Sequence, residues 1–416
     1  MRMSKKNKTA LIPKLRFPVY TSLENWKIEK LGNVTYTVSK KNTNRVMYPI
    51  YSINNKEGFL PQADQFEGVD SNSRGYDISL YKIIGKKTFA YNPARINVGS
   101  IGYSGDLYDI IISSLYVCFK TNDEIEDKFF QYFITTSYFN KQVNNNTEGG
   151  IRNYLFYENF SRILIAFPDI NEQQKIADCL SSLDDLITAE NKKLEALKAH
   201  KKGLLQKLFP AEGETVPEWR FSEFNNTYSW KLNTIRNSCE TFSGGTPDTS
   251  KGEYYNGNIP FIRSGEIDNT KTELFISIEG LNNSSAKMVK SGDVLVAMYG
   301  ANSGDVAISK INGAINQAIL CLRHETNNLF IYQYLNHKKN WIITSFLQGG
   351  QGNLSGEIIK SIKLFFPSSK EQQLIANFFS SLDEVISLQI MKIKSLKTHK
   401  KGLMQGLFPS INEVYE

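Results

Sequence analysis

The chain has 416 residues, more than one hydrophobic core usually serves, so we expect two or three domains. Hydrophobic residues make up 41% of it and aromatic residues 12%, which excludes a chain that is disordered throughout. A net charge of +7 and a pI near 8.9 favour a polyanionic partner, although 42 acidic residues stand against 49 Lys and Arg.

The first residues do not resemble a targeting segment. Met1–Lys8 is basic, but prolines and basic residues interrupt the stretch from Thr9 to Tyr20, so a signal peptide's apolar core is missing. We expect no membrane-spanning run. The four cysteines lie far apart without CxxC spacing, which indicates a reducing cytosol and no structural zinc; they are Cys118, Cys179, Cys239 and Cys321. A soluble, cytoplasmic protein is therefore expected.

Residues 1–168 form the first predicted domain. Short β-branched and aromatic runs, such as "DIIISSLYVCF" at 109–119, alternate with Gly, Asn, Asp and Pro, which is typical of short strands joined by loops. A helical segment is expected from Asp127 to Val143. The pattern predicts a mixed α+β domain.

Residues 169–210 form the next element, one long helix. Its apolar residues recur at alternating spacings of four and three over about five heptads, which is the pattern of a coiled coil. At 1.5 Å per residue this helix is roughly 55 Å long. Asn171 and Gln174 suit a capping box, and Phe209-Pro210 ends the helix. The predicted stripe is Ile176, Leu180, Leu183, Ile187, Leu194, Leu197, Leu204 and Leu208.

A linker at 211–217 leads into a second α+β domain at 218–366. Strand-like runs lie at 293–300 and 315–322, and a helix is expected from Leu329 to Leu347. The two domains align loosely, for example through "GSIG" at 99–102 and "GANSG" at 300–304. We therefore expect one fold with divergent loops.

Residues 367–409 repeat the first long helix, and a short tail at 410–416 follows. "PSSKEQQLIANFFSSLDEVISLQIMKIKSLKTHKKGLMQGLFP" matches the segment from Pro168 at roughly half of its positions, without a gap. The two helices are predicted to pack as an antiparallel coiled coil that separates two target-binding domains. The second stripe is Ile375, Phe379, Leu382, Ile386, Ile393, Leu396, Leu403 and Leu407.

Two positions of each stripe are polar. Glu190 and Gln389 share one of them, and Lys201 and Lys400 share the other. Long side chains can simply extend out of a short coiled coil. Alternatively, Glu190 and Gln389 lie near the helix midpoints, so an antiparallel pairing brings them together, and we predict a hydrogen bond that fixes the register.

Catalytic and cofactor motifs are missing from the sequence. It holds no phosphate-cradling GxxxxGK[ST], no GxSxG, no HExxH and no GxGxxG. His200 and His399 lie in matching "KAHKKG" and "KTHKKG" stretches, where a helix-end cation is favoured over catalysis. We predict no catalytic residue, no metal and no cofactor in this chain.

The doubled helical segment resembles the conserved regions of type I restriction-modification specificity subunits. The resemblance covers essentially the whole chain. Its motif is carried by Pro168, Glu172, Gln173, Gln174, Ile176, Ala177, Leu183 and Asp184, and again by Pro367, Glu371, Gln372, Gln373, Ile375, Ala376, Leu382 and Asp383. The second domain is similar to the family's target-recognition domains at 243–267, 281–287 and 314–319; the first resembles another branch at 92–105.

This resemblance implies a non-catalytic DNA-recognition subunit. Each target-recognition domain would read one half of a bipartite site on double-stranded DNA, while the helices set the spacing. The resemblance also implies partners: two copies of an adenine methyltransferase (modification) subunit that uses S-adenosylmethionine, and ATP-dependent restriction subunits.

Candidate DNA contacts are loop residues that can reach base edges or phosphates. Stabilisation of turns by Asn, Ser and Gly is an equal alternative for any single position, and Asn316 in particular suits the capping of a strand end. The candidates are Ser52, Asn54, Arg74, Tyr76, Arg95, Asn97, Arg152 and Asn153 in the first domain, and Thr246, Arg263, Ser264, Tyr299, Asn302, Asn316, Gln351 and Asn353 in the second.

Two other classes of function remain open. The heptads alone would suit a scaffolding protein with two appended binding domains. A methyltransferase or nuclease with unrecognised catalytic residues is the second alternative, and activity of the purified chain without any partner would distinguish it.

Overall fold

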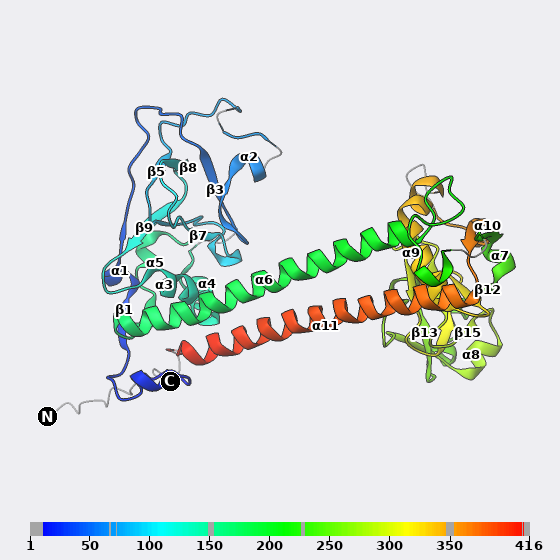
Figure 1. The fold of residues 1–416 in the computed structure, drawn as a ribbon. Coiled ribbons are helices and arrows are strands. Elements are labelled where there is room, and N and C mark those ends of the chain that lie inside the picture. The colour runs from blue at the N-terminus through cyan, green and yellow to red at the C-terminus, as the bar shows by residue number, and fades with distance from the viewer. Residues whose placement is uncertain are drawn as a thin grey trace. The chain divides into compact units, whose positions relative to one another are not determined.

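The computed structural model describes residues 11–65, 68–71, 73–148, 154–225, 229–346, 353–409 and 411 (Figure 1). The chain divides into two compact units: Met1–Ala189 with Ile393–Glu416, and Glu190–Lys392. This division passes through both long helices, so each unit takes part of each helix. This division differs from the predicted domain boundaries at 168, 210 and 366, which separate the long helices from the two domains. Those boundaries stay a prediction.

The first unit contains two four-stranded sheets, in the orders β2-β9-β6-β7 and β4-β3-β8-β5, and the antiparallel pair β1-β10. Within the second sheet, β3 and β8 are parallel, with Ile50 opposite Ile111. The elements are η1 Pro18–Tyr20, β1 Lys27–Lys30, α1 Leu31–Val34, β2 Thr35–Thr37, β3 Ile50–Asn54, β4 Gly58–Pro61, α2 Gln62–Gln65, β5 Lys82–Ile84, β6 Phe89–Tyr91, η2 Ile96–Val98, β7 Ile101–Tyr103, β8 Ile110–Ile112, β9 Val117–Thr121, α3 Asp127–Phe133, α4 Ser137–Asn146, α5 Tyr157–Phe160 and β10 Leu164–Phe167.

The second unit repeats this topology. Its sheets have the orders β12-β19-β16-β17 and β14-β13-β18-β15, with the pair β11-β20, and β13 runs parallel to β18. The elements are η3 Ser222–Phe224, β11 Lys231–Thr234, α7 Ile235–Ser238, β12 Cys239–Ser243, η4 Gly252–Tyr255, β13 Ile259–Ile262, η5 Ser264–Glu266, β14 Leu274–Ile276, α8 Ile278–Asn282, β15 Lys287–Val289, β16 Val294–Ala297, β17 Val306–Ile308, β18 Gly313–Ile315, β19 Ile319–His324, α9 Asn328–Phe346, α10 Gly356–Ser361 and β20 Lys363–Phe366. The predicted α+β class and the shared fold are confirmed.

Each unit buries an aromatic core that includes residues from both long helices. In the first unit, Ile176 and Leu407, one from each long helix, share a cluster with Phe129 and Phe408, whose rings stack at 5.1 Å. In the second, Leu208 and Ile375, again one from each long helix, share a cluster with Phe209, whose ring packs on that of Tyr334 at 4.4 Å. The ends of the long helices are therefore part of the domain cores.

The long helices are α6, Ile170–Leu208, and α11, Ser369–Leu407, each of 39 residues (Figure 1). Every predicted stripe position is buried or half-buried. Within the second unit, Glu190 contacts Gln389 and Lys201 contacts Asp383, so residue numbers rise along α6 as they fall along α11. The helices are antiparallel there, as predicted.

The helix starts differ from the predicted caps. The Asp169 carboxylate, not Asn171, accepts hydrogen bonds from the backbone N–H groups of Asn171 at 2.9 Å and Glu172 at 3.2 Å. In α11 the Ser368 hydroxyl accepts from the N–H of Glu371 at 3.3 Å. Each helix therefore begins just after the proline that follows the last strand of its domain. An oxygen of a nearby side chain accepts hydrogen bonds from the first free backbone N–H groups of the helix.

The helix expected from Asp127 to Val143 is broken. Residues 134–136 separate α3 from α4, because the Thr136 hydroxyl caps the second helix and accepts from the Phe139 N–H at 3.2 Å. The run at 109–119 is likewise divided, and its two strands, β8 and β9, enter different sheets.

Among the residues that the structure describes, one helix, α11, contains an 18-residue window with a mean hydropathy of 1.2, of which 22% is buried. By length and composition it is long enough to span a membrane, which differs from the expectation of no such run. A buried core helix and a signal sequence meet the same criterion, so this helix by itself does not assign the chain to a membrane.

Candidate nucleic-acid interface

In the first unit, the structure brings Asn54, Arg95 and Asn97 together. Asn54 ends β3, and its side chain accepts from the N–H of Lys56 at 2.7 Å. Arg95 and Asn97 are exposed in the loop that contains η2. That loop closes on the β3–β4 turn at Gly99, where φ is +89° and a Cβ would lie 3.4 Å from the backbone oxygen of Asn55. The three residues thus share one edge of the unit.

The other described candidates of this unit lie around α2. Ser52 is only 5% exposed, and its hydroxyl donates to Gln65, so it does not reach the surface from β3. Arg74 and Tyr76 are exposed in the following loop, and Tyr76 is 60% exposed. Of this group, Arg74 and Tyr76 are accessible to a ligand. Arg152, Asn153 and Gln351 lie outside the described residues.

In the second unit, Thr246 and Asn316 meet through Gln317. The Thr246 hydroxyl donates to the Gln317 side-chain oxygen at 2.7 Å. The Asn316 side chain accepts a hydrogen bond from the backbone N–H of Ala318 at 3.1 Å. This is the turn-stabilising geometry that the sequence left open as an alternative for this residue. Asn316 therefore has a local structural role, whether or not it contacts DNA.

The remaining candidates of this unit follow β16. Tyr299 is 37% exposed, and the neighbouring Met298 carbonyl accepts from the N–H of Leu354 at 2.9 Å, which brings the exposed Asn353 to the same region. In the first unit the Pro93 carbonyl accepts from Leu155 in the equivalent way, at 3.0 Å. The two units thus present matching loops with different residues.

Arg263, Ser264 and Asn302 line one open pocket of about 650 Å³. Arg263 is already engaged there: its guanidinium donates to Glu266 at 3.0 Å and to Glu273 at 2.5 Å. These hydrogen bonds raise the pKa of Arg263. Burial alone would raise the pKa of Glu266, but its hydrogen bonds with Arg263 and with the backbone N–H of Glu273 together outweigh burial and lower it. Contact between Arg263 and a base therefore requires that the exposed pair with Glu273 opens.

The segment before each domain is tied to a long helix by a buried ion pair. Arg16 contacts Glu172 at 2.7 Å, and the side chains are 6% and 1% exposed. Arg220 contacts Glu371 at 2.6 Å, with exposures of 10% and 2%. Both pairs are bidentate, the geometry that compensates best for burial of the charges. The glutamate of each repeated "EQQ" thus anchors the preceding chain.

The aspartate of each repeated "LD" joins three elements. Asp184 accepts from Lys400 of α11 at 2.5 Å and from Tyr132 of α3 at 2.9 Å. Asp383 accepts from Lys201 of α6 at 2.5 Å and from Gln333 of α9 at 2.7 Å. These two polar junctions, centred on Asp184 and Asp383, connect each domain to both helices. These junctions were not predicted from the sequence, although Lys201 and Lys400 align in the repeat just as the aspartates do.

Comparison with known proteins agrees with this doubled geometry. A family model described as the type I restriction modification DNA specificity domain matches residues 23–199 and again residues 229–398. The chain belongs to the type I restriction-modification DNA specificity family.

This specificity subunit is 22% identical over 415 residues to the type I restriction enzyme MjaVIII specificity subunit of Methanocaldococcus jannaschii, and the match covers 92% of each chain. It shares its fold with a type I restriction-modification S subunit from M. genitalium, with a TM-score of 0.60, 15% identity and coverage of 95% and 99%. A chain from a structural study of complex assembly in a type I R-M system also has a TM-score of 0.60, at 15% identity, with coverage of 92% and 97%.

Glu190 and Gln389 form the hydrogen bond that was predicted. The Gln389 amide donates to the Glu190 carboxylate at 2.7 Å and to its backbone oxygen at 2.9 Å, and Lys392 adds a contact at 2.6 Å. The bond to Gln389, followed by that to Lys392, lowers the pKa of Glu190. Its role in fixing the register of the specificity subunit stays a prediction.

Two cysteines and one histidine have pKa values that burial shifts strongly. Burial raises the pKa of Cys118 to about 11 and that of Cys239 to about 12, so both thiols stay protonated at neutral pH. Burial lowers the pKa of His337, which stacks on Phe209, to about 4. Among the described residues, no three His, Cys, Asp or Glu side chains are grouped to hold a metal ion.

Proposed function

We propose that this specificity subunit reads a bipartite site on double-stranded DNA, with one half-site for each unit, chiefly through the major groove. The observation that carries the proposal is the pair of identical sheet orders with different residues on equivalent loops. A shared scaffold with divergent loops suits two readers of different sequences. Binding then depends on both units, and each unit determines the bases of one half-site.

The accessible loop residues have the chemistry that such reading requires. Arginine donates two hydrogen bonds to guanine, and asparagine pairs with adenine in the major groove. Arg95 and Asn97 in the first unit, and Asn302 and Asn353 in the second, are the strongest choices, because all four reach solvent in loops. Arg152, Asn153 and Gln351 remain proposals from the sequence.

The two long helices are proposed to set the spacing between the half-sites. Recognition elements on one face of B-DNA lie about 34–36 Å apart per helical turn. A helix of 39 residues is about 58 Å long, enough to separate two readers by that distance. The hydrogen bond between Glu190 and Gln389 would then keep the two helices in a single register.

Partner subunits are proposed to supply the chemistry. Two copies of an adenine methyltransferase and ATP-dependent restriction subunits would dock on this chain in the cytoplasm. The chain itself would carry out no catalysis and supply no cofactor for the methylation or the cleavage. An exposed apolar face on α11 supports docking: Val385, Leu388 and Met391 are 46%, 55% and 55% exposed. Apolar residues at this spacing on a helix suit a partner helix.

Mapping of methylated adenines tests the proposal. Cells that express this chain with its modification subunit are expected to methylate one motif with two specified parts and an unspecified spacer. Cells with the modification subunit alone should lack that motif. A contiguous motif, or methylation that does not depend on this chain, would rule the proposal out.

A further inference from the structure

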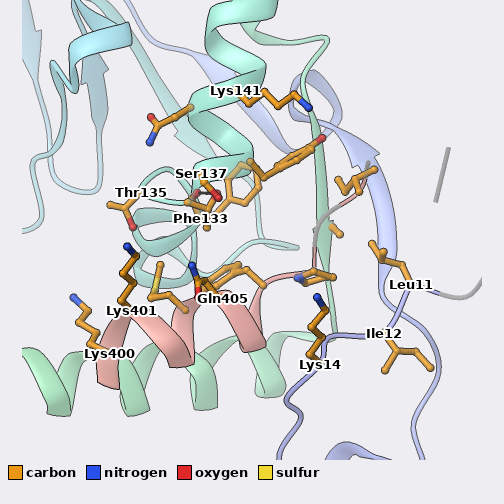
Figure 2. A pocket seen from close by; sticks show the side chains of 18 of the residues that line it. Leu11, Ile12, Lys14, Phe133, Thr135, Ser137, Lys141, Lys400, Lys401 and Gln405 are labelled. Atoms are coloured by element: carbon orange, nitrogen blue, oxygen red, sulfur yellow. Dashed lines mark hydrogen bonds between the residues drawn. The ribbon is translucent and has the colours of Figure 1, made fainter. Parts of the chain in front are cut away.

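The first unit holds a pocket of about 740 Å³ that no proposed DNA contact uses (Figure 2). Its walls are the segment around Lys14, the start of α4 and the last turns of α11. This volume lies within the range of small-molecule and cofactor sites. The pocket therefore has room for a ligand of its own.

Lysines dominate the charge of this pocket. Lys14, Lys141, Lys397, Lys400 and Lys401 line it, and none of its lining residues is acidic. The Asp184 carboxylate, outside the lining, partly balances Lys400. In the part of the chain that the structure describes, Lys141, Lys397 and Lys401 have no ion-pair partner. Several ammonium groups facing one cavity favour an anion with more than one negative charge.

The rest of the pocket is partly apolar. Ile12 offers accessible apolar surface there and is 54% exposed, whereas the neighbouring lining residues Leu11 and Phe133 are only 6% and 4% exposed. On the opposite wall, Thr135 and Ser137 lie at the start of α4, whose helix dipole adds a positive potential. Figure 2 shows Lys401 and Gln405 rising from α11 below Ser137 and Thr135. A matching ligand combines phosphates with a flat apolar group.

The internal repeat offers a comparison within the same chain. At the equivalent place in the second unit, Glu218 stands where the first unit has Lys14, and it pairs with Lys207 at 3.3 Å. Burial lowers the pKa of Lys338 there, and the nearby Glu212 opposes that shift. The second unit thus supplies its own carboxylates, whereas the first concentrates lysines.

We propose that this lysine pocket binds a nucleoside polyphosphate, with phosphates on the lysines and the base on the apolar side. Duplex DNA fits less well, because its phosphates would leave the apolar wall uncovered. Binding joins the N-terminal segment, α4 and the end of α11, so it stabilises the first unit against unfolding.

Isothermal titration calorimetry of the full chain tests this site, with ATP, inorganic tripolyphosphate and adenosine as separate ligands. ATP is expected to bind at least about tenfold more tightly than either fragment, because only ATP can contact the lysines with its phosphates and the apolar side chains with its base. Its binding should also raise the Tm of the chain. Equal binding of tripolyphosphate, or no binding of ATP, would overturn the proposal.

Two variants localise the binding. The double variant with Lys141→Glu and Lys401→Glu should bind ATP with an affinity about tenfold or more lower, while its circular dichroism spectrum stays unchanged. The matched control, Lys202→Glu, alters the repeat equivalent of Lys401 in the second unit and should leave the affinity unchanged. Equal effects of both variants would contradict the site. Displacement of ATP by a nonspecific DNA duplex at equal phosphate concentration would also contradict the site. ATP binding that occurs only after residues 412–416 are deleted would contradict it as well.

Discussion

Two carboxylates within its own unit hold the candidate DNA contact Arg263. Its guanidinium lies between Glu266, which is 7% exposed, and Glu273, whose side chain is 79% exposed. A solvent-exposed ion pair contributes at most about 1 kcal/mol, so DNA can replace Glu273 at small cost. Glu266 would then hold the guanidinium in place while its other edge meets a base.

Arg263→Ala should therefore change recognition of one half-site only. Loss of a bidentate contact to guanine costs about 1–3 kcal/mol of discrimination at that position. Methylation motifs from the variant should show relaxed bases in the second unit's half-site and an intact first half-site.

The control is Arg236→Ala, which removes another exposed arginine of the same unit, one that pairs with Glu357 on α10 and is not among the candidate DNA contacts. This variant should keep the complete motif. Equal loss at both half-sites in Arg263→Ala would indicate phosphate contact or misfolding instead.

His337 predicts a pH dependence of stability. Burial lowers its pKa from 6.5 to about 4 in the folded chain, so the unfolded state binds a proton more readily. The resulting stability is fully present above about pH 6.5 and is lost as the pH falls towards 4, by about 2–3 kcal/mol. Urea unfolding across this range measures it. His337→Phe keeps a ring against Phe209 and should flatten the profile, and an equally steep profile in that variant would assign the loss to other groups.

At the scale of elements, the polar junctions explain why each helix contacts its domain in one orientation. Asp383 of α11 accepts from Lys201 of α6 and from Gln333 of α9, so a shift of α11 breaks both bonds, whereas a shift of α6 breaks only the bond to Lys201. Asp184 has the same arrangement with Lys400 and Tyr132. The two copies of the repeat thus share a set of polar contacts as well as an apolar stripe.

A double-mutant cycle on Lys201 and Asp383 tests this junction. Lys201→Met and Asp383→Asn should show a coupling free energy of about 1 kcal/mol, because Lys201 is only 16% exposed and the charges are partly desolvated. Chemical denaturation of the four chains gives the value. The exposed pair of Lys198 with Glu195 on the same helix face should show coupling near zero. Additive effects at Lys201 and Asp383 would mean that the junction contributes no specific free energy.

At the scale of the whole molecule, the sequence predicted what depends on periodicity and repetition. The stripes from Ile176 and Ile375 predicted both long helices, because seven-residue spacing needs no knowledge of the fold. The bond between Glu190 and Gln389 was also predictable, since antiparallel pairing brings helix midpoints together.

Contacts that depend on tertiary placement could not be predicted in this way. Lys400 meets Asp184 from 216 residues away, and only the observed helix register brings them together. Ser52 was chosen as a loop residue but lies in a buried strand, because a sequence pattern does not show which loop covers it. Glu273 reaches Arg263 only after β13 and β14 pair.

The two units are proposed to read half-sites whose spacing the helices set. Insertion of seven residues near the midpoints of both α6 and α11 keeps the heptad pattern and lengthens each helix by about 10 Å, or roughly three base pairs. Methylation mapping of cells expressing this variant with the modification subunit should then yield the same two half-sites with a spacer about three base pairs longer. Unchanged half-sites with an unchanged spacer would contradict the account.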